Sequence, residues 1–298
     1  MNWNIDQISN LDAKTVLITG ANSGIGLEAA KILASKGAEV ILACRNPTKG
    51  KAALETVQAL SSSDSASLME LDLASLESIR AFTAKFSKKY SKLDILINNA
   101  GIMAPPFATT NDGFESQFGT NHLGHFALTG QLLPLLEAAD FSRVVVLSSV
   151  MHRMGKINLE NLNAEKYYQK WIAYGQSKLA NLMFAKELQR RLEQAGSNVM
   201  AVAAHPGYSA TNLTQHTVIG TMMKKVAQPQ DKGCLPTLFA ATSNSIAGGD
   251  YIGPDGWMEI KGNPQIAYVA PKANNLHVAS RLWDVSQEMT GIRYLTQS

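Results

Sequence analysis

The chain is 298 residues long, with 45% hydrophobic and 17% charged residues, a composition that excludes intrinsic disorder and favours a large buried core. At roughly 150 residues per domain, the length alone would suggest two domains. Lys and Arg number 27 against 24 Asp and Glu, which leaves a formal net charge of +3, and so small a surplus argues against nucleic acid as a partner, because nucleic-acid-binding proteins carry a concentrated basic surface.

Short apolar runs alternate with longer amphipathic segments from residue 15 to residue 203. Most of the runs are apolar at successive positions, which is typical of strands buried on both faces of a parallel sheet. In chain order we expect a strand at 15–19, a helix at 24–36, a strand at 39–43, a helix at 48–59, a strand at 67–71, a helix at 76–90, a strand at 95–98, a helix at 113–138, a strand at 144–148, a helix at 171–193 and a strand at 198–203. The alternation predicts an α/β fold with a Rossmann-type doubly wound parallel sheet and helices on both faces.

The turn after the first expected strand is rich in glycine. Residues 19–26 read Thr-Gly-Ala-Asn-Ser-Gly-Ile-Gly. Glycine tolerates a left-handed turn and lets backbone approach a ligand closely, and the free N–H groups of a helix N-terminus attract phosphate. We therefore expect a dinucleotide site here rather than a purely structural turn. The expected contacts are Gly20, Asn22, Ser23, Gly24, Ile25 and Gly26.

The end of the second expected strand indicates which dinucleotide binds. An acidic residue there would accept a hydrogen bond from the ribose 2′-hydroxyl, but this chain has Cys44 and Arg45. A guanidinium suits a 2′-phosphate through charge and paired hydrogen bonds, so the expected cofactor is NADP(H); the alternative is that Arg45 is a solvated loop charge. Arg45 and Asn46 are expected cofactor contacts, together with Asp72 and Leu73, where the adenine ring would lie.

Tyr174 and Lys178 are four residues apart in an expected helix, a spacing that stacks two side chains on one face. A free phenol titrates near pH 10, and an adjacent ammonium favours the phenolate and so lowers the pKa of the tyrosine. Such a tyrosine can take a proton from an alcohol or donate one to a carbonyl. The spacing also fits an ordinary surface pair, so its weight depends on the accompanying motifs.

Taken together, the motifs resemble a known family. The glycine-rich turn is followed by Asn-Asn-Ala-Gly at 98–101, by Asn121, by the pair Ser148-Ser149 after a strand, and by Tyr174 with Lys178. In order and spacing this set resembles the short-chain dehydrogenase/reductase family over residues 14–211. Segments 120–126 and 173–181 look like its retinol-dehydrogenase-like branch, which includes many bacterial oxidoreductases and is related to light-dependent protochlorophyllide reductase.

The resemblance implies a role for each matching residue. Tyr174 would be the general acid/base, and Lys178 would lower its pKa and bond the nicotinamide ribose. Ser149, the second serine of the pair, would orient and polarise the reacting oxygen, and Asn121 would hold a water that links Lys178 to bulk solvent. Further cofactor contacts implied by the resemblance are Asn99, Ala100, Gly101, Pro206, Gly207, Ser209 and Thr211, although Ser209 stands where valine is common in the family.

These roles imply that a hydride passes from NADPH to a carbonyl carbon while Tyr174 supplies the proton, with alcohol oxidation as the reverse. Two apolar segments bear on the small-molecule substrate. Residues 151–172 form a long connection, and residues 208–232 are placed to cover the nicotinamide end as a mobile lid. Their composition favours a lipophilic ketone, aldehyde or alcohol, but inward packing would explain it equally well.

Two alternatives stand beside this interpretation: a catalytically silent NADP(H)-sensing or scaffold protein on the same fold, and a pigment reductase. The expected acid/base residues are all present, which favours the enzyme. Neither half of the chain holds a complete site, so residues 1–298 are expected to form a single domain despite their length. The apolar faces of the expected helices at 113–138 and 171–193 fit either a homodimer or homotetramer interface, as in many relatives, or core packing.

The remaining expectations concern metals and location. His122 and His125 are three residues apart, but no third ligand accompanies them, so no metal site is expected. Cys44 and Cys234 are too few for a disulfide framework and fit free thiols in a reducing compartment. No secretory signal and no stretch of 18 apolar residues is evident, so we expect no integral membrane segment and a cytoplasmic location.

Overall fold

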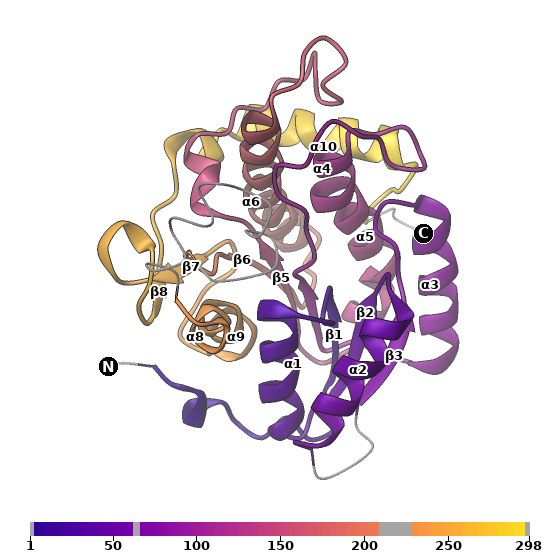
Figure 1. Cartoon of the computed structure of the whole chain (residues 1–298), viewed down its shortest axis with the longest axis vertical. Coiled ribbons are helices and arrows are strands. Elements are labelled where there is room, and N and C mark those ends of the chain that lie inside the picture. Colours follow the sequence, from indigo (N-terminus) through magenta and orange to yellow (C-terminus); the bar gives the residue numbers. More distant parts are fainter. Residues whose placement is uncertain (1–2, 62–65, 209–227, 296–298) are drawn as a thin grey trace.

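The computed structural model describes residues 3–61, 66–208 and 228–295. Within these residues, eight strands form one sheet in the order β3-β2-β1-β4-β5-β6-β7-β8. Neighbouring strands from β3 to β7 are parallel, and β8 runs antiparallel to β7. The strands are β1 (Thr15–Thr19), β2 (Glu39–Cys44), β3 (Ala66–Glu70), β4 (Ile95–Asn98), β5 (Ser142–Leu147), β6 (Val199–Ala204), β7 (Tyr251–Pro254) and β8 (Pro264–Ile266). The predicted Rossmann-type α/β fold is confirmed (Figure 1).

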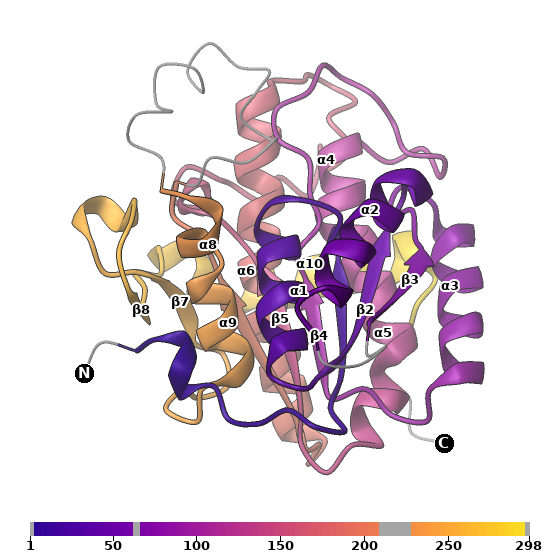
Figure 2. The same cartoon turned by 60° about the horizontal axis from the view of Figure 1, so that its bottom comes forward.

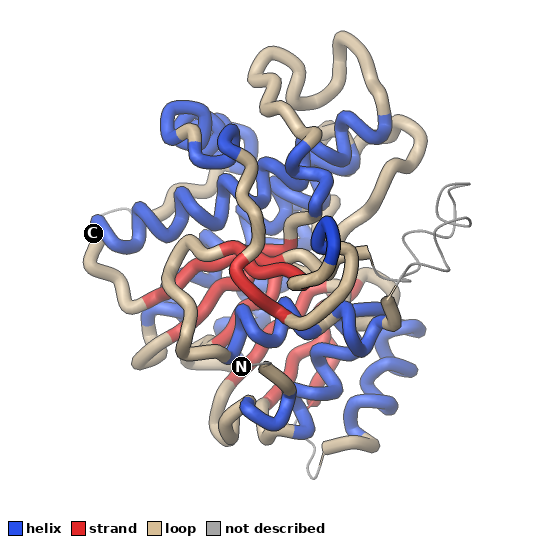
Figure 3. The backbone as a smooth tube through the Cα atoms, turned by 90° about the vertical axis from the view of Figure 1, so that its left-hand side faces the viewer, coloured by secondary structure: helices blue, strands red, loops and turns tan. Residues whose placement is uncertain are grey.

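Helices cover both faces of the sheet, as Figure 3 shows with helices in blue and strands in red. Helices α1, α2, α8 and α9 lie on one side, in front of the sheet in Figure 2, and the other long helices lie behind it. The helices are α1 (Gly24–Ser35), α2 (Pro47–Gln58), α3 (Leu76–Lys89), α4 (Ser116–Phe118), α5 (Gly124–Glu137), α6 (Lys170–Gln194), α8 (Gln230–Gly233), α9 (Leu235–Thr242) and α10 (Leu276–Thr290). None of these described helices combines the length and the apolarity that a membrane span requires.

Alternate residues of each central strand enter opposite cores. In β1, Leu17 packs with the side chains of α3, α5, α6 and α10, whereas Val16 and Ile18 pack with those of α1, α2 and α9. The strand is buried along its whole length, because side chains alternate across a sheet that is covered on both faces. This double burial is the reason why successive positions in the strand are apolar.

The predicted helix at 113–138 is wrong in its first part. Gly113 has a left-handed backbone, with φ of +82°, so no helix passes through it. The helix instead begins at Ser116, where the Glu115 carboxylate accepts hydrogen bonds from the backbone N–H groups of the first turn. A π-helical turn, η2 (Gly119–Leu123), then separates α4 from α5. Such turns often mark functional positions in helices, and this one contains Asn121.

The C-terminal third of the chain adds elements that the sequence pattern did not predict, namely β7, β8, α8, α9 and α10. Helix α10 packs against α5 and α6. Its Trp283 contacts the ring of Phe126 on α5 edge-on at 5.1 Å between ring centroids, and the Arg191 guanidinium of α6 lies 4.6 Å from the Trp283 ring. The apolar faces of α5 and α6 that were candidates for a subunit interface are therefore packed, at these contacts, against the chain's own C-terminal helix.

Candidate active site

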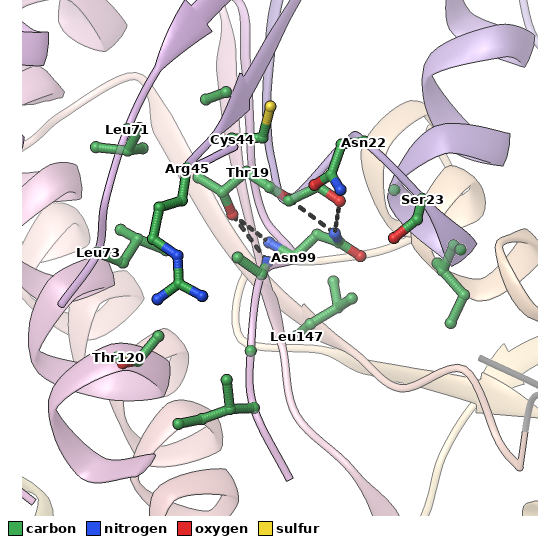
Figure 4. Close-up of a pocket in the computed structure, with 18 of the residues that line it drawn as sticks. Thr19, Asn22, Ser23, Cys44, Arg45, Leu71, Leu73, Asn99, Thr120 and Leu147 are labelled. Atoms are coloured by element: carbon green, nitrogen blue, oxygen red, sulfur yellow. Dashed lines mark hydrogen bonds between the residues drawn. The ribbon is translucent and has the colours of Figure 1, made fainter. Parts of the chain in front are cut away.

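A cavity of about 360 Å³ opens at the C-terminal ends of β1, β2, β4 and β5 (Figure 4). The strand order reverses between β1 and β4, and such a switch point is where doubly wound sheets bind ligands. The cavity draws on segments that lie far apart in the sequence. The expected contacts that line it are Gly20, Asn22, Ser23, Gly24, Ile25, Gly26, Arg45, Asp72, Leu73, Asn99, Ala100, Gly101, Tyr174, Lys178 and Pro206.

Some expected contacts lie outside this lining. The Asn46 side chain accepts a hydrogen bond from the Lys49 backbone N–H at 2.9 Å and so caps α2. Gly207 adopts a φ of +64°, and a Cβ there would lie 2.3 Å from the Ile260 carbonyl oxygen. The backbone therefore requires glycine at this position whether or not it contacts a cofactor. Ser209 and Thr211 lie outside the described residues, as do positions 209–227 of the expected lid.

The glycine-rich turn has the conformation that its sequence suggests. Gly20 and Gly24 have φ values of +66° and +62°, which favour glycine. A Cβ on Gly26 would lie 2.5 Å from the Asn99 Nδ2 atom, and that amide donates a hydrogen bond to the Thr19 carbonyl at 2.7 Å. Ser23 precedes α1 without a side-chain capping bond, so the first N–H groups of this helix are available to a phosphate.

Arg45 extends from the end of β2 toward Leu73 and Thr120 in Figure 4. Its side chain is exposed, and among the described residues no carboxylate lies within ion-pair distance of its guanidinium. Cys44 is buried beside it, and burial raises the pKa of the Cys44 thiol. At this end of the cavity the Arg45 guanidinium is therefore available to bind an anion. The turn, the uncapped helix and Arg45 together fit a dinucleotide that carries an extra phosphate.

Tyr174 and Lys178 lie on one face of α6 and meet the end of β5. Tyr174 is 7% exposed, and the Ser149 hydroxyl lies close enough to its phenol to act on the pKa of Tyr174. The Lys178 Nζ atom lies 5.8 Å from the centroid of the Tyr174 ring and donates to the Leu147 carbonyl at 3.2 Å. Ser148 also lines the cavity, but its hydroxyl donates to the Lys178 carbonyl at 2.7 Å. Of the serine pair, Ser149 is therefore the one whose hydroxyl acts on the phenol.

The lowered pKa expected for Tyr174 is wrong for this geometry. Burial raises the pKa of Tyr174 to about 12, and the nearby Ser149 hydroxyl opposes this shift only in part. Burial also lowers the pKa of Lys178 to about 8, because both side chains are driven toward their uncharged forms. At neutral pH the phenol is protonated, and it can donate a proton to an acceptor oxygen.

Asn121 occupies the π-helical turn beneath this pair and is fully buried. Its side chain bonds the Ile102 backbone in both directions, accepting from N–H at 2.8 Å and donating to the carbonyl at 3.0 Å. It also donates to the Ser177 hydroxyl at 2.9 Å. A Cβ on Gly101 would lie 3.1 Å from Asn121 Oδ1 and 3.6 Å from Lys178 Nζ, so this glycine lies at the junction of the two residues.

Side chains outside the sequence motifs support the loop that follows Ser149. His152 bonds the Ser149 carbonyl at 2.7 Å, and the Glu259 carboxylate bonds both Arg153 and His205. Little in the sequence indicated these contacts, because the partners are up to 106 positions apart. In the described part of the chain no group of three potential ligands could hold a metal ion.

Comparison with known proteins identifies the family of the chain. A model of the short chain dehydrogenase family matches residues 14–220. Retinol dehydrogenase 12 of Mus musculus is 40% identical over 290 residues, which covers 95% of this chain and 88% of the relative. Retinol dehydrogenase 14 of Homo sapiens is 41% identical over 305 residues, with the same coverages of 95% and 88%.

Solved structures show the same fold. The crystal structure of an uncharacterised protein from Mycobacterium Paratuberculosis has a TM-score of 0.84 and 43% identity, and the match covers 99% of this chain and 100% of that one. The Pseudomonas aeruginosa RhlG/NADP active-site complex has a TM-score of 0.68 and 23% identity, covering 84% and 98%. At this lower identity the likeness shows the fold alone.

The chain belongs to the short-chain dehydrogenase family. Within the family it falls in the retinol-dehydrogenase-like branch, because relatives of that name match it over 95% of its length. Both resemblances expected from the sequence are thereby confirmed. The family and these relatives place the chain among oxidoreductases of alcohol and carbonyl groups.

Proposed function

We propose that this protein is an NADP(H)-dependent oxidoreductase that interconverts a lipophilic carbonyl compound and its alcohol, with Tyr174 as general acid/base. The observation that carries the proposal is that the buried Tyr174 phenol and Lys178 line the same cavity as the glycine-rich turn. Since the cofactor contacts come from the first half of the chain and Tyr174 from the second, we propose that the chain works as a single domain.

The bound nicotinamide would supply or accept the hydride, and the side chains would handle the oxygen and its proton. The Ser149 hydroxyl acts on the pKa of the Tyr174 phenol and so lies near it, and a substrate oxygen that reaches both groups could accept a hydrogen bond from each. Because the pKa of Tyr174 is raised to about 12, the phenol carries the proton that reduction requires. The Lys178 ammonium, close to the ring, would stabilise the phenolate that is left.

Arg45 supports NADP(H) rather than NAD(H). Its exposed guanidinium reaches the cavity without a carboxylate partner among the described residues, and guanidinium pairs well with a phosphate. For the substrate, Ile102, Leu147 and Pro206 give the opposite end of the cavity an apolar wall. The names of the curated relatives, which are retinol dehydrogenases, agree with a lipophilic alcohol or aldehyde.

The proposal is tested by the consumption of NADPH and of NADH with a panel of ketones and aldehydes that includes retinal. We expect turnover with NADPH that Tyr174→Phe lowers by about 10²–10⁴-fold, the usual contribution of general acid/base catalysis. Tyr90→Phe is the matched control, because Tyr90 is also 7% exposed but bonds Ser67 away from the cavity. Equal activity of Tyr174→Phe and Tyr90→Phe would refute the assignment, and no turnover on any carbonyl would refute the enzyme.

A further inference from the structure

A chain of hydrogen bonds joins the floor of the cofactor cavity to Asn121 through His125. His125 is fully buried at the second position of α5. Its Nε2 atom lies 2.9 Å from the Thr19 hydroxyl oxygen, and its Nδ1 atom lies 2.9 Å from the Asn121 carbonyl oxygen. Thr19 is the last residue of β1 and lines the cavity. The imidazole therefore spans the gap between the cofactor strand and the π-helical turn.

The partners of Thr19 determine which nitrogen of His125 carries the proton. The Thr19 hydroxyl oxygen accepts hydrogen bonds from the backbone N–H groups of Asn99 and Ala100, each at 2.9 Å. A hydroxyl has two lone pairs and a single proton, so both lone pairs are used and the proton points elsewhere. His125 Nε2 at 2.9 Å is a nearer acceptor than the Ile97 carbonyl at 3.4 Å. Nε2 therefore accepts, and Nδ1–H donates to the Asn121 carbonyl.

The surroundings favour this neutral form. Burial lowers the pKa of His125 to about 4, and the nearby Lys178 charge acts in the same direction, against the opposing hydrogen bond to Asn121. A protonated imidazole would present N–H to the Thr19 hydroxyl, whose lone pairs are already occupied. The ring is thus held in one tautomer, with one acceptor and one donor that point to different elements of the fold.

We propose that His125 is a positioning residue whose neutral, Nδ1-protonated imidazole fixes the Asn121 carbonyl relative to the cavity floor formed by Thr19, Asn99 and Ala100. The inference rests on the proposed function, because it gives the cofactor floor and Asn121 a shared geometry. Removing the imidazole leaves the Thr19 hydroxyl only the more distant Ile97 carbonyl, at 3.4 Å, as an acceptor, and it takes this donor from the Asn121 carbonyl. Both groups are buried, and an unpaired buried polar group is costly.

His122 provides a matched control on the same stretch of chain. It is 1% exposed, and its Nε2 atom bonds the Ser286 hydroxyl on α10 at 2.9 Å, so it is a buried imidazole that faces away from the cavity. His122→Phe and His125→Phe both replace a buried ring that makes a hydrogen bond. A general loss of core packing would affect the two variants alike, whereas the loss of positioning would affect His125→Phe alone.

The test combines amide hydrogen exchange at Asn99 and Ala100 with the dissociation constant for NADPH, measured by fluorescence, and with kcat and KM. We expect His125→Phe to raise exchange at both amides and the dissociation constant by about tenfold, and to lower kcat, with no such effects in His122→Phe. His125→Gln keeps an acceptor within reach of Thr19, so we expect it to restore protection of both amides and most of the NADPH affinity.

Two results would overturn the inference: exchange and NADPH affinity in His125→Phe equal to those in His122→Phe, or ¹⁵N shifts of His125 that show a proton on Nε2. Failure of the proposed function has a different signature, because a wild-type protein that binds no NADPH would still report on His125 through amide exchange and the ¹⁵N shifts.

Discussion

Lys178 is buried, and burial disfavours the charged ammonium form of its side chain. Its side chain is 5% exposed, and burial lowers its pKa from 10.5 to about 8. At about 1.4 kcal/mol per pKa unit, that shift corresponds to about 3 kcal/mol of free energy that the folded protein loses while the ammonium stays charged. The position of Lys178 beside Tyr174 explains why such a cost would be retained in an enzyme, since active sites are often less stable than the fold allows.

Replacing Lys178 with methionine should therefore stabilise the fold while it abolishes activity. The Leu147 carbonyl keeps a partner, because Asn181 also donates to it at 2.9 Å. We expect urea unfolding at pH 6.5 to show a gain of about 1–3 kcal/mol over wild type. The gain should shrink as pH rises from about 8 to 10.5, where the folded wild type sheds the proton before the unfolded chain does.

The exposed Lys85 is the control for this prediction. We expect Lys85→Met to change the free energy of unfolding by less than about 0.5 kcal/mol at either pH, as is usual for surface substitutions. A Lys178→Met variant that is less stable than wild type at pH 6.5 would contradict the assigned cost of the buried ammonium.

Arg45 should determine the preference for NADPH over NADH. Arg45→Asp should lower kcat/KM with NADPH and improve it with NADH, because a carboxylate repels a 2′-phosphate and accepts a hydrogen bond from a 2′-hydroxyl. We expect the ratio of the two kcat/KM values to fall by about 100-fold or more, from interactions of a few kcal/mol. Lys51→Asp makes the same charge change at an exposed site of α2 outside the cavity and should leave the ratio within about threefold. Equal ratios in both variants would refute the role of Arg45.

At the scale of elements, local patterns decided what could be predicted. The strands β1, β2, β4, β5 and β6 were recognisable because both faces are buried and most of their residues are apolar in succession, whereas β3, with Ser67 and Glu70, is only partly buried and gave a weaker pattern. In β7, Gly253 and Pro254 obscure the pattern, and β8 has three residues and begins with Pro264. Both residue types disfavour strands in general. The π-helical turn was equally hidden, because a helix with one widened turn keeps an amphipathic pattern.

In the candidate site, too, only the features set by local sequence could be predicted. Tyr174 and Lys178 were predictable as a pair because four residues bring two side chains to one helix face. His125 and Thr19 are 106 positions apart, and nothing in their local sequence joins them. The pKa of Tyr174 was predicted in the wrong direction because burial, which dominates it, depends on tertiary packing that spacing does not describe.

The hairpin of β7 and β8 is tied to the active-site loop by one carboxylate. Glu259 accepts hydrogen bonds from His205 at 3.0 Å, from Arg153 at 2.5 Å and from the Tyr268 backbone at 2.8 Å. Burial acts to raise the pKa of Glu259, but these donors together hold it below its ordinary value. Glu259 therefore links the end of β6, the loop after Ser149 and the hairpin.

Glu259→Gln should destabilise the protein, because the amide presents an N–H group to a site where all the partners are donors. We expect a loss of about 1–3 kcal/mol in the free energy of unfolding at pH 7. Glu160→Gln is the control, since its ion pair with Lys166 is highly exposed and should change stability by less than about 0.5 kcal/mol. A loss for Glu259→Gln as small as that for Glu160→Gln would show that Glu259 contributes no more than an exposed charge.

At the scale of the whole molecule, the C-terminal segment completes the core on one face of the sheet. Trp283 of α10 and Tyr294 beyond it pack against Phe126 and Phe184 on α5 and α6. The Tyr294 hydroxyl also donates to the Phe126 carbonyl. These contacts bury Phe126 and Phe184 within the chain's own core, so the C-terminal segment occupies the part of α5 and α6 that carries them.

Gly130 on α5 allows this arrangement to be tested. A Cβ at this position would lie 2.6 Å from both Ile292 and Tyr294, so Gly130→Leu should displace the C-terminal segment. We expect a loss of about 1–3 kcal/mol from the steric conflict, although leucine is intrinsically the better helix former. Light scattering should then show association that grows with concentration, because the apolar faces of α5 and α6 become exposed. Ala52→Leu, at an exposed site of α2, should leave stability and mass unchanged. If Gly130→Leu behaves like this control, the C-terminal segment does not protect these faces.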